Sequence, residues 1–168
     1  MNHDELTREV YAHYGLSMYF SQVLEHGIVN ALTLIDFIPS NIINTTSRSE
    51  WEDKHDKFTE YHFKKTLGSM IKSLKKHIEI ENDFEFKLND ALEVRNFLAH
   101  HYFQQRTDIF MTEKGCYEMI KELKNYQTTL RDADTLLESV IRPYRIKVGL
   151  TDEKLNESLE RYKIGDEI

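Results

Sequence analysis

The spacing of hydrophobic positions along the chain predicts long helices. From about Asp4 to Ile38, apolar residues recur every three or four positions, which is the spacing of one face of an α-helix. Pro39 opens the polar stretch PSNIINTTSRS, so we expect the first helix to end there and a loop to follow.

A second helical region is predicted from Ser49, where Ser49 and Glu52 have the spacing of a capping box. Gly68 suggests a break within this region, and the apolar spacing resumes after it and continues to Ile78. The following segment, EIENDFEF, is expected to be a loop or a short turn.

The remaining sequence predicts a third helix over about 88–105 and a long fourth helix that begins after Thr112 as its cap. Pro143 should kink or end the fourth helix near Arg142, because proline lacks the backbone N–H that a helix interior needs. Thr151 is placed to cap a short terminal helix.

Together these elements predict an all-α fold, namely an antiparallel bundle of about four main helices plus a short C-terminal helix. With 168 residues, the chain is long enough for one hydrophobic core. We expect residues 1–150 to form the bundle, and residues 151–168 to form a capped helix or tail that packs on it.

Composition narrows the class of protein. We find no apolar run as long as a membrane span and no leader-like N-terminus, and Cys116 is the single cysteine. These features favour a cytoplasmic protein with no membrane partner. Glu52 and His55 form the only Glu-x-x-His pair, and glycine-rich phosphate loops are absent, so we expect neither a metal nor another cofactor.

The charge is unevenly distributed. A net charge of −7 disfavours broad binding to nucleic acid, because such binding depends on neutralising phosphates. Residues 54–77, however, contain seven lysines against one Asp and one Glu, a balance of 7 − 2 = +5. This segment is either a solvated face or a surface for a polyanion. In the second case the candidate substrate-binding residues are Lys72, Lys75 and Lys76.

The predicted third helix carries an arginine in the centre of its apolar arc. On a helical projection Arg95 falls among Val94, Leu98 and their apolar neighbours. A guanidinium cannot lose its charge in a protein, so it needs a carboxylate, several carbonyls or a ligand. Two interpretations stay open: a bundle-fixing ion pair, or a binding site. For the ion pair the candidate carboxylates are those of Glu25, Asp36 and Glu93.

The segment RNFLAH, which contains Arg95, Asn96 and His100, resembles the signature of the HEPN superfamily. Members of that superfamily are helical bundles, and many are metal-independent ribonucleases that act as toxins or defence factors. The resemblance implies a homodimeric endoribonuclease with Arg95, Asn96 and His100 as catalytic residues. It also implies RNA as substrate and an antitoxin or other protein as a partner. His101 and Tyr102 are secondary candidates for substrate contact, with a surface histidine and a packing tyrosine as the alternatives.

Helix geometry adds a condition to this hypothesis. Five residues separate Arg95 from His100, which on a regular helix places them about 140° apart. Either the helix is distorted near His100, or two chains contribute complementary groups to one site. The sequence also leaves open a non-catalytic HEPN-like module that binds nucleotides, RNA or proteins.

Overall fold

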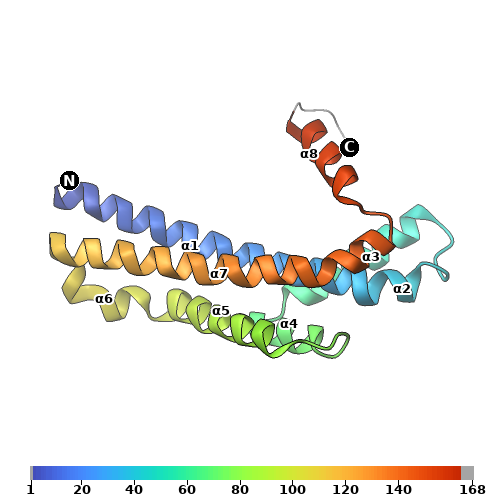
Figure 1. The fold of residues 1–168 in the computed structure, drawn as a ribbon, viewed down its shortest axis with the longest axis horizontal. Helices are drawn as coiled ribbons and strands as arrows, with labels where there is room; N and C mark the ends of the chain where they lie inside the picture. The colour runs from blue at the N-terminus through green and yellow to red at the C-terminus, as the bar shows by residue number, and fades with distance from the viewer. Residues whose placement is uncertain (1, 164–168) are drawn as a thin grey trace.

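The computed structural model describes residues 2–163, and this part of the chain confirms the all-α prediction. The helices, shown in Figure 1, are α1 (His3–Leu32), the π-helix η1 (Thr33–Phe37), α2 (Ile38–Asn41), α3 (Arg48–Phe63), α4 (Leu67–Leu74), α5 (Asn82–His100), α6 (Tyr102–Phe110), α7 (Glu113–Lys147) and α8 (Asp152–Lys163).

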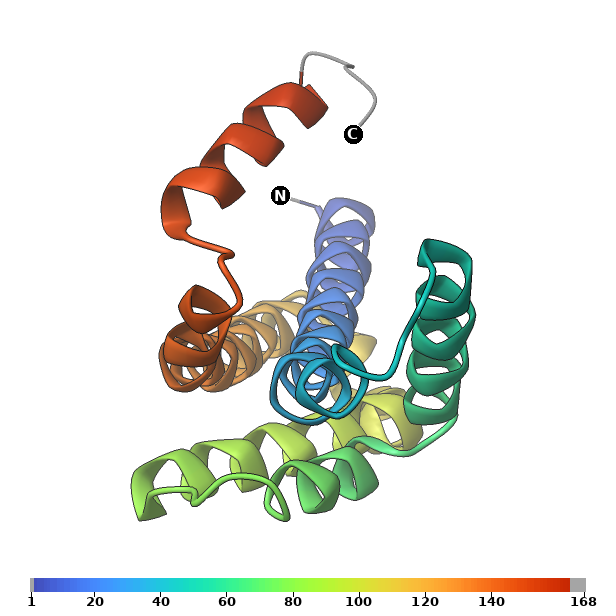
Figure 2. The same cartoon turned by 90° about the vertical axis from the view of Figure 1, so that its right-hand side faces the viewer.

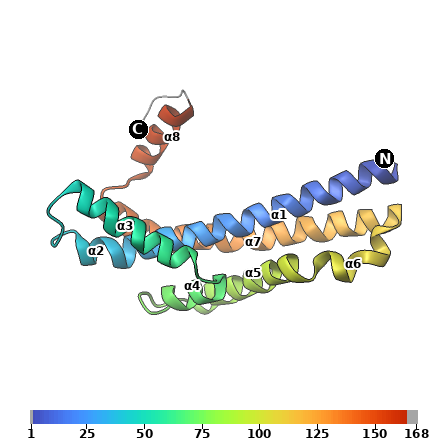
Figure 3. The ribbon, with the colours of Figure 1, turned by 180° about the vertical axis from the view of Figure 1, so that it is seen from behind.

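The two longest helices, α1 and α7, lie side by side and run in the same direction, whereas α5 and α6 run in the opposite direction (Figures 1 and 3). The antiparallel arrangement therefore holds for α5 against its neighbours but not between α1 and α7. A buried polar contact joins the long pair: Gln127 Nε2 donates to the His13 carbonyl at 2.9 Å and to Ser17 Oγ at 3.3 Å. His13 is thus a hydrogen-bonded residue of the helix interface.

The core is a continuous layer of side chains mainly from α1, α4, α5 and α7, with Tyr102 from α6. Its members recur at helical spacing and are fully or almost fully buried, which is what the apolar stripes of the sequence require. The largest fully buried side chains are Leu6, Leu24, Ile28, Leu32, Leu67, Met70, Leu74, Leu88, Leu98, Tyr102, Met119 and Leu123.

The first helical segment continues past Pro39, contrary to the prediction. The π-helix η1 precedes this proline, which lies near the start of α2, where a missing backbone N–H is tolerated. The helical path therefore extends to Asn41. Pro143 likewise lies inside α7, which continues to Lys147, although its last turns change direction in Figure 1. The helix does not end near Arg142, and the change of direction agrees with the kink that was the other predicted outcome.

The helix starts agree with the sequence only in part. Ser47 caps α3 by accepting from the Glu50 N–H at 3.2 Å, so the predicted start at Ser49 is two residues late. The segment EIENDFEF is half helical, because α5 begins at Asn82. Thr112 caps α7 as predicted and accepts from the Gly115 N–H at 3.0 Å.

The C-terminal helix α8 leaves the bundle instead of packing on it. Thr151 precedes it and accepts from the Lys154 N–H at 3.4 Å, as its predicted role as a cap requires. Every residue from 153 to 163 is exposed, and α8 projects from the end of α7 on the side opposite α5 (Figure 2). The predicted packing on the bundle is therefore absent from the described part of α8, and residues 164–168 of that prediction lie outside the described chain.

Candidate functional site

Arg95 lies on α5 and forms an ion pair with α1. Its Nε donates to Glu25 Oε1 at 3.1 Å, and its Nη1 donates to Asn96 Oδ1 at 3.3 Å. Of the three carboxylates considered from the sequence, Glu25 is therefore the partner. The Arg95 side chain is 25% exposed and that of Glu25 is 20% exposed, so water reaches both groups.

The two histidines of the motif lie at a break in the helix. α5 ends at His100, and His101 has φ −132° and ψ −17°, outside helical geometry, before α6 begins at Tyr102. Both imidazoles are exposed, with ring centroids 6.1 Å apart. The predicted single helix over 88–105 is therefore two helices. The distortion near His100, one of the two options that the spacing left open, is present.

Asn96 and His100 share one exposed strip of α5 with Asn89. The positions differ by seven and four, so on the helix they lie within about 40° of one another. From Asn89 to His100 the strip extends about 16 Å at 1.5 Å per residue. Arg95 reaches this strip through its hydrogen bond to Asn96. The strip therefore carries amide groups, the exposed carboxylate of Glu93, an imidazole at one end and a guanidinium at its edge.

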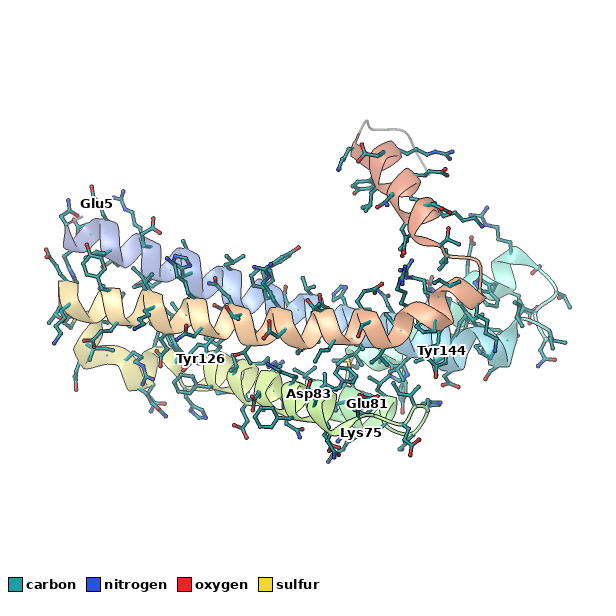
Figure 4. The ribbon with its side chains drawn as sticks, viewed as in Figure 1. Glu5, Lys75, Glu81, Asp83, Tyr126 and Tyr144 are labelled. Atoms are coloured by element: carbon teal, nitrogen blue, oxygen red, sulfur yellow. The ribbon has the colours of Figure 1, made fainter. Side chains whose placement is uncertain are left out.

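A hollow of about 330 Å³ between α4 and α5 lies at the other end of the strip, where Lys72, Lys75 and Asn89 line it. Neither Arg95 nor His100 lines it. Lys75 is paired with Glu85 and lies on the outer side of the bundle, away from α7 (Figure 4). Lys76 is exposed just beyond α4. Two of the three lysines selected from sequence therefore adjoin the strip.

Tyr102 is a packing residue in this structure. Only 1% of it is exposed, and its hydroxyl donates to the Met119 carbonyl at 3.4 Å. Burial raises the pKa of the Tyr102 phenol, with the Glu122 carboxylate adding to the effect. The ring stacks on Tyr14, with centroids 5.7 Å apart. Of the two residues proposed for secondary substrate contact, only His101 reaches solvent.

A polar network next to the helix break was not found from the sequence. Arg106 on α6 forms a bidentate pair with Glu122 on α7, with Nε–Oε2 at 3.0 Å and Nη2–Oε1 at 2.6 Å. Tyr126 donates its hydroxyl to the same carboxylate at 2.9 Å, between α7 and the α5–α6 layer (Figure 4). The residues come from two helices, and their separation in sequence carries no motif. The network fixes α6 on α7 and thereby the position of the break.

This network also changes the acid–base properties of its members. Burial opposes ionisation of Glu122, but the Arg106 and Tyr126 hydrogen bonds outweigh it and hold the pKa of that carboxyl below its ordinary value. Burial and the Glu122 hydrogen bond raise the pKa of Tyr126 to about 12. Glu122 is therefore a charged structural residue near neutral pH.

Within residues 2–163, no group of three or more His, Cys, Asp or Glu side chains is arranged to hold a metal ion. None of the helices in the same range is long and apolar enough to cross a bilayer. What the strip and the adjoining helix break offer chemically is amide hydrogen bonding, one carboxylate, a guanidinium and the accessible imidazoles of His100 and His101.

Comparisons with known proteins do not add to this description. No protein-family model, no curated protein and no solved structure was found to match the chain. The likeness to the HEPN superfamily therefore rests on the RNFLAH segment and on the all-helical fold that carries it.

Proposed function

We propose that this protein is a dimeric, metal-independent endoribonuclease of the HEPN type. The observation that supports it best is the arrangement of Arg95, Asn96 and His100 at the end of α5. The Arg95 guanidinium reaches Asn96, and Asn96 shares its exposed strip with His100. These are the three residues for which the sequence resemblance implies a catalytic role.

The proposed reaction uses the RNA as its own nucleophile. The ribose 2′-oxygen attacks the adjacent phosphorus, the bond to the 5′-oxygen breaks, and a 2′,3′-cyclic phosphate and a 5′-hydroxyl are formed. One proton leaves the 2′-hydroxyl and one is delivered to the 5′-oxygen. Imidazoles act as general acids and bases in this pH range, so His100 carries out one of these transfers. Arg95 stabilises the charge that develops on the phosphate oxygens.

Glu25 has a positioning role in this scheme. It binds only Nε of Arg95, and the guanidinium has further N–H groups on its two terminal nitrogens. The ion pair orients the planar fork, and the terminal nitrogens remain for a phosphate. Lys72 and Lys75, about 16 Å along the strip, contact the RNA backbone away from the cleavage point.

Dimerisation is part of the proposal because α5 is helical through His100, which keeps Arg95 and His100 about 140° apart. No hydrogen bond joins Arg95 to His100 within the described chain, and the proposal assigns the second proton transfer to the His100 of another copy. A dimer in the cytoplasm that cleaves RNA fits the action of a toxin or defence factor, and a protein antitoxin is then its expected partner.

A second candidate function is a non-catalytic module that binds RNA or nucleotides. One observation favours it: Glu25 already neutralises much of the Arg95 charge in the free protein. In this alternative the ion pair fixes α5 on α1, and the exposed strip binds a ligand without cutting it.

Cleavage of a labelled structured RNA by the purified protein in excess EDTA tests the proposal. We expect Arg95→Ala and His100→Ala to lower the rate by roughly 10²-fold or more. Arg48→Ala is the control, because it removes an arginine that is also paired with a glutamate but lies on α3, outside the strip and the network at the helix break. It should leave the rate within about threefold and change stability little, since this pair is exposed.

The outcomes separate the two candidates. Loss of cleavage in the Arg95 and His100 variants, with unchanged activity in the Arg48 variant, supports the ribonuclease. RNA binding by the parent without cleavage, weakened by Arg95→Ala, supports the binding module. Cleavage that persists in all three folded variants refutes the assignment of the site.

A further inference from the structure

The exposed helix α8 carries an apolar stripe that its own bundle does not cover. Leu155, Leu159 and Tyr162 have the spacing i, i+4, i+7, and they are 37%, 57% and 75% exposed. An amphipathic helix normally buries such a stripe against another surface.

The charges of α8 are sorted around this stripe. On a helical projection the basic residues Lys154 and Lys163 flank the stripe, one on each side, and Arg161 lies between Lys154 and the acidic face. The acidic residues Glu153, Glu157 and Glu160 occupy the opposite face of the helix. The surface that binds the apolar stripe is therefore expected to be acidic or neutral at its edges.

A network of ion pairs fixes the direction of α8. Arg145, only 7% exposed, donates to the Leu150 carbonyl at 2.9 Å and to Glu138 Oε1 at 3.0 Å. Arg142 and Arg145 both bind Asp152 at the first residue of α8, and together they lower the pKa of that carboxyl to about 2. These ion pairs at the junction of α7 and α8, here called the Arg145 corner, hold α8 away from the bundle (Figure 2).

A groove along α1 and α7 has the features that the stripe requires. Its volume is about 450 Å³, and it is lined by Tyr19, Gln22, Val23, His26, Gly27, Asn30 and Asp134. It lies about 130° around α1 from Glu25, on a different face from the Arg95 ion pair.

Asp134 is a half-buried carboxylate within this groove. A Cβ added at Gly27 would lie only 3.1 Å from its Oδ1, so the absence of a side chain there lets α7 approach α1 closely. Asp134 has no hydrogen bond or ion pair with any other residue of 2–163. Burial raises its pKa, and the neighbouring Glu138 adds to that effect. A basic group from outside the bundle would relieve this desolvated charge.

The helix and the groove match in length as well as in charge. The α1 positions that line the groove, 19 to 30, span about 17 Å, and the 12 residues of α8 span about 18 Å. With the stripe on Tyr19 and Val23, the basic residues that flank it, Lys154 and Lys163, lie at the edges of the groove that Asp134 lines.

We infer that α8 of one chain docks into the α1–α7 groove of a second copy, and that the exchange is reciprocal. One chain carries both halves of the interface, and the Arg145 corner holds α8 out where another molecule can reach it. In a two-fold dimer each contact occurs twice, so two short helices bury an area that one could not. This inference stands on α8 and the groove and does not need the ribonuclease activity.

Sedimentation equilibrium of the full chain tests the inference. We expect a dimer, and we expect Leu159→Ser with Tyr162→Ser to raise its dissociation constant roughly tenfold or more. Both side chains are exposed, so these changes leave the fold intact. Asp134→Asn should also weaken the dimer. Tyr117→Ser is the matched control: Tyr117 is 52% exposed on α7, outside the groove, and its loss should have no effect.

Cross-linking then identifies which copy provides the helix. In a chain carrying Gln22→Cys and Ser158→Cys, a short bis-maleimide should produce a covalent dimer of twice the mass. Any of three results would overturn the inference: a monomeric parent, a dimer that the Leu159→Ser and Tyr162→Ser changes leave unchanged, or cross-links within single chains. RNA cleavage by a parent that forms a dimer without docked α8 helices would leave the ribonuclease proposal intact, whereas a dimer with docked α8 helices that does not cleave RNA would refute only that proposal.

Discussion

Replacing Glu25 by Gln separates the structural and the catalytic contributions of the Arg95 ion pair. The change keeps the shape of the side chain and an oxygen that accepts from Arg95 Nε, but it removes the charge. Because both side chains are only 20–25% exposed, the pair lies between the surface and the buried extremes. Exposed pairs contribute about 0.2–1 kcal/mol, and breaking a buried pair costs about 3–5 kcal/mol.

For Glu25→Gln we expect a loss of about 1 kcal/mol in the free energy of unfolding. Arg95 then keeps one hydrogen bond to residue 25, one to Asn96, and access to water. In a chain of this length that loss corresponds to a fall of about 2–4 °C in Tm. Arg95→Met should cost more, about 2 kcal/mol, because it leaves the Glu25 carboxylate largely desolvated and without its partner.

The assay combines urea unfolding of both single variants and the double variant with RNA cleavage at saturating and subsaturating RNA. This double-mutant cycle should give a coupling energy of about 1 kcal/mol between the Glu25 and Arg95 side chains. In Glu25→Gln the guanidinium keeps its charge and loses its counter-ion. The KM for RNA should therefore fall severalfold while kcat stays within about tenfold.

Two results would refute this reasoning. A coupling energy near zero would show that the ion pair does not hold α5 on α1. Complete loss of cleavage in a folded Glu25→Gln protein would show that the carboxylate itself acts in the reaction, which contradicts its positioning role.

Three further predictions concern stability. Glu122→Gln should cost about 2 kcal/mol at pH 7, because it weakens the bidentate pair with Arg106. Since the folded-state pKa of Glu122 is lowered, the difference in unfolding free energy between the parent and the variant should be present above pH 4.5 and lost as the pH falls through the folded pKa. Urea unfolding between pH 3 and 7 measures this difference, and a value that does not change with pH would contradict the prediction. His62 is 5% exposed, its Nδ1 has no hydrogen-bond partner, and burial lowers its pKa. The unfolding free energy should therefore fall as the pH drops below about 6.5, and His62→Phe should reduce this dependence on pH. The same dependence on pH in both proteins would contradict the prediction. Gly115→Ala should destabilise the folded protein by about 2 kcal/mol or more, because an added Cβ would lie 1.8 Å from the Ile109 carbonyl oxygen. An unchanged Tm in thermal unfolding would exclude this clash.

Local sequence signals identified single elements well where the cause is local. The cap at Thr112 depends on a side chain and an N–H three residues apart, so its residue could be named in advance. Pro39 misled for the opposite reason: a proline costs a helix one hydrogen bond, and the packing of neighbouring side chains decides whether the helix continues. At Pro143 the helix changes direction, one of the two predicted outcomes, and continues to Lys147. The break at His101 was one of two options that the spacing of Arg95 and His100 left open, and the sequence could not choose between them because the burial of Tyr102 and the pairing of Arg106 with Glu122 depend on α7.

The sequence by itself determined the helical class, the apolar faces and the presence of an arginine that had to find a partner. Those properties follow from residue spacing and from a guanidinium that cannot lose its charge. Only the tertiary structure decided that Glu25 is the partner, that α1 and α7 are parallel, and that α8 stands away from the bundle. Each of these features depends on contacts between residues far apart in the chain, and local sequence patterns do not predict the energies of such contacts.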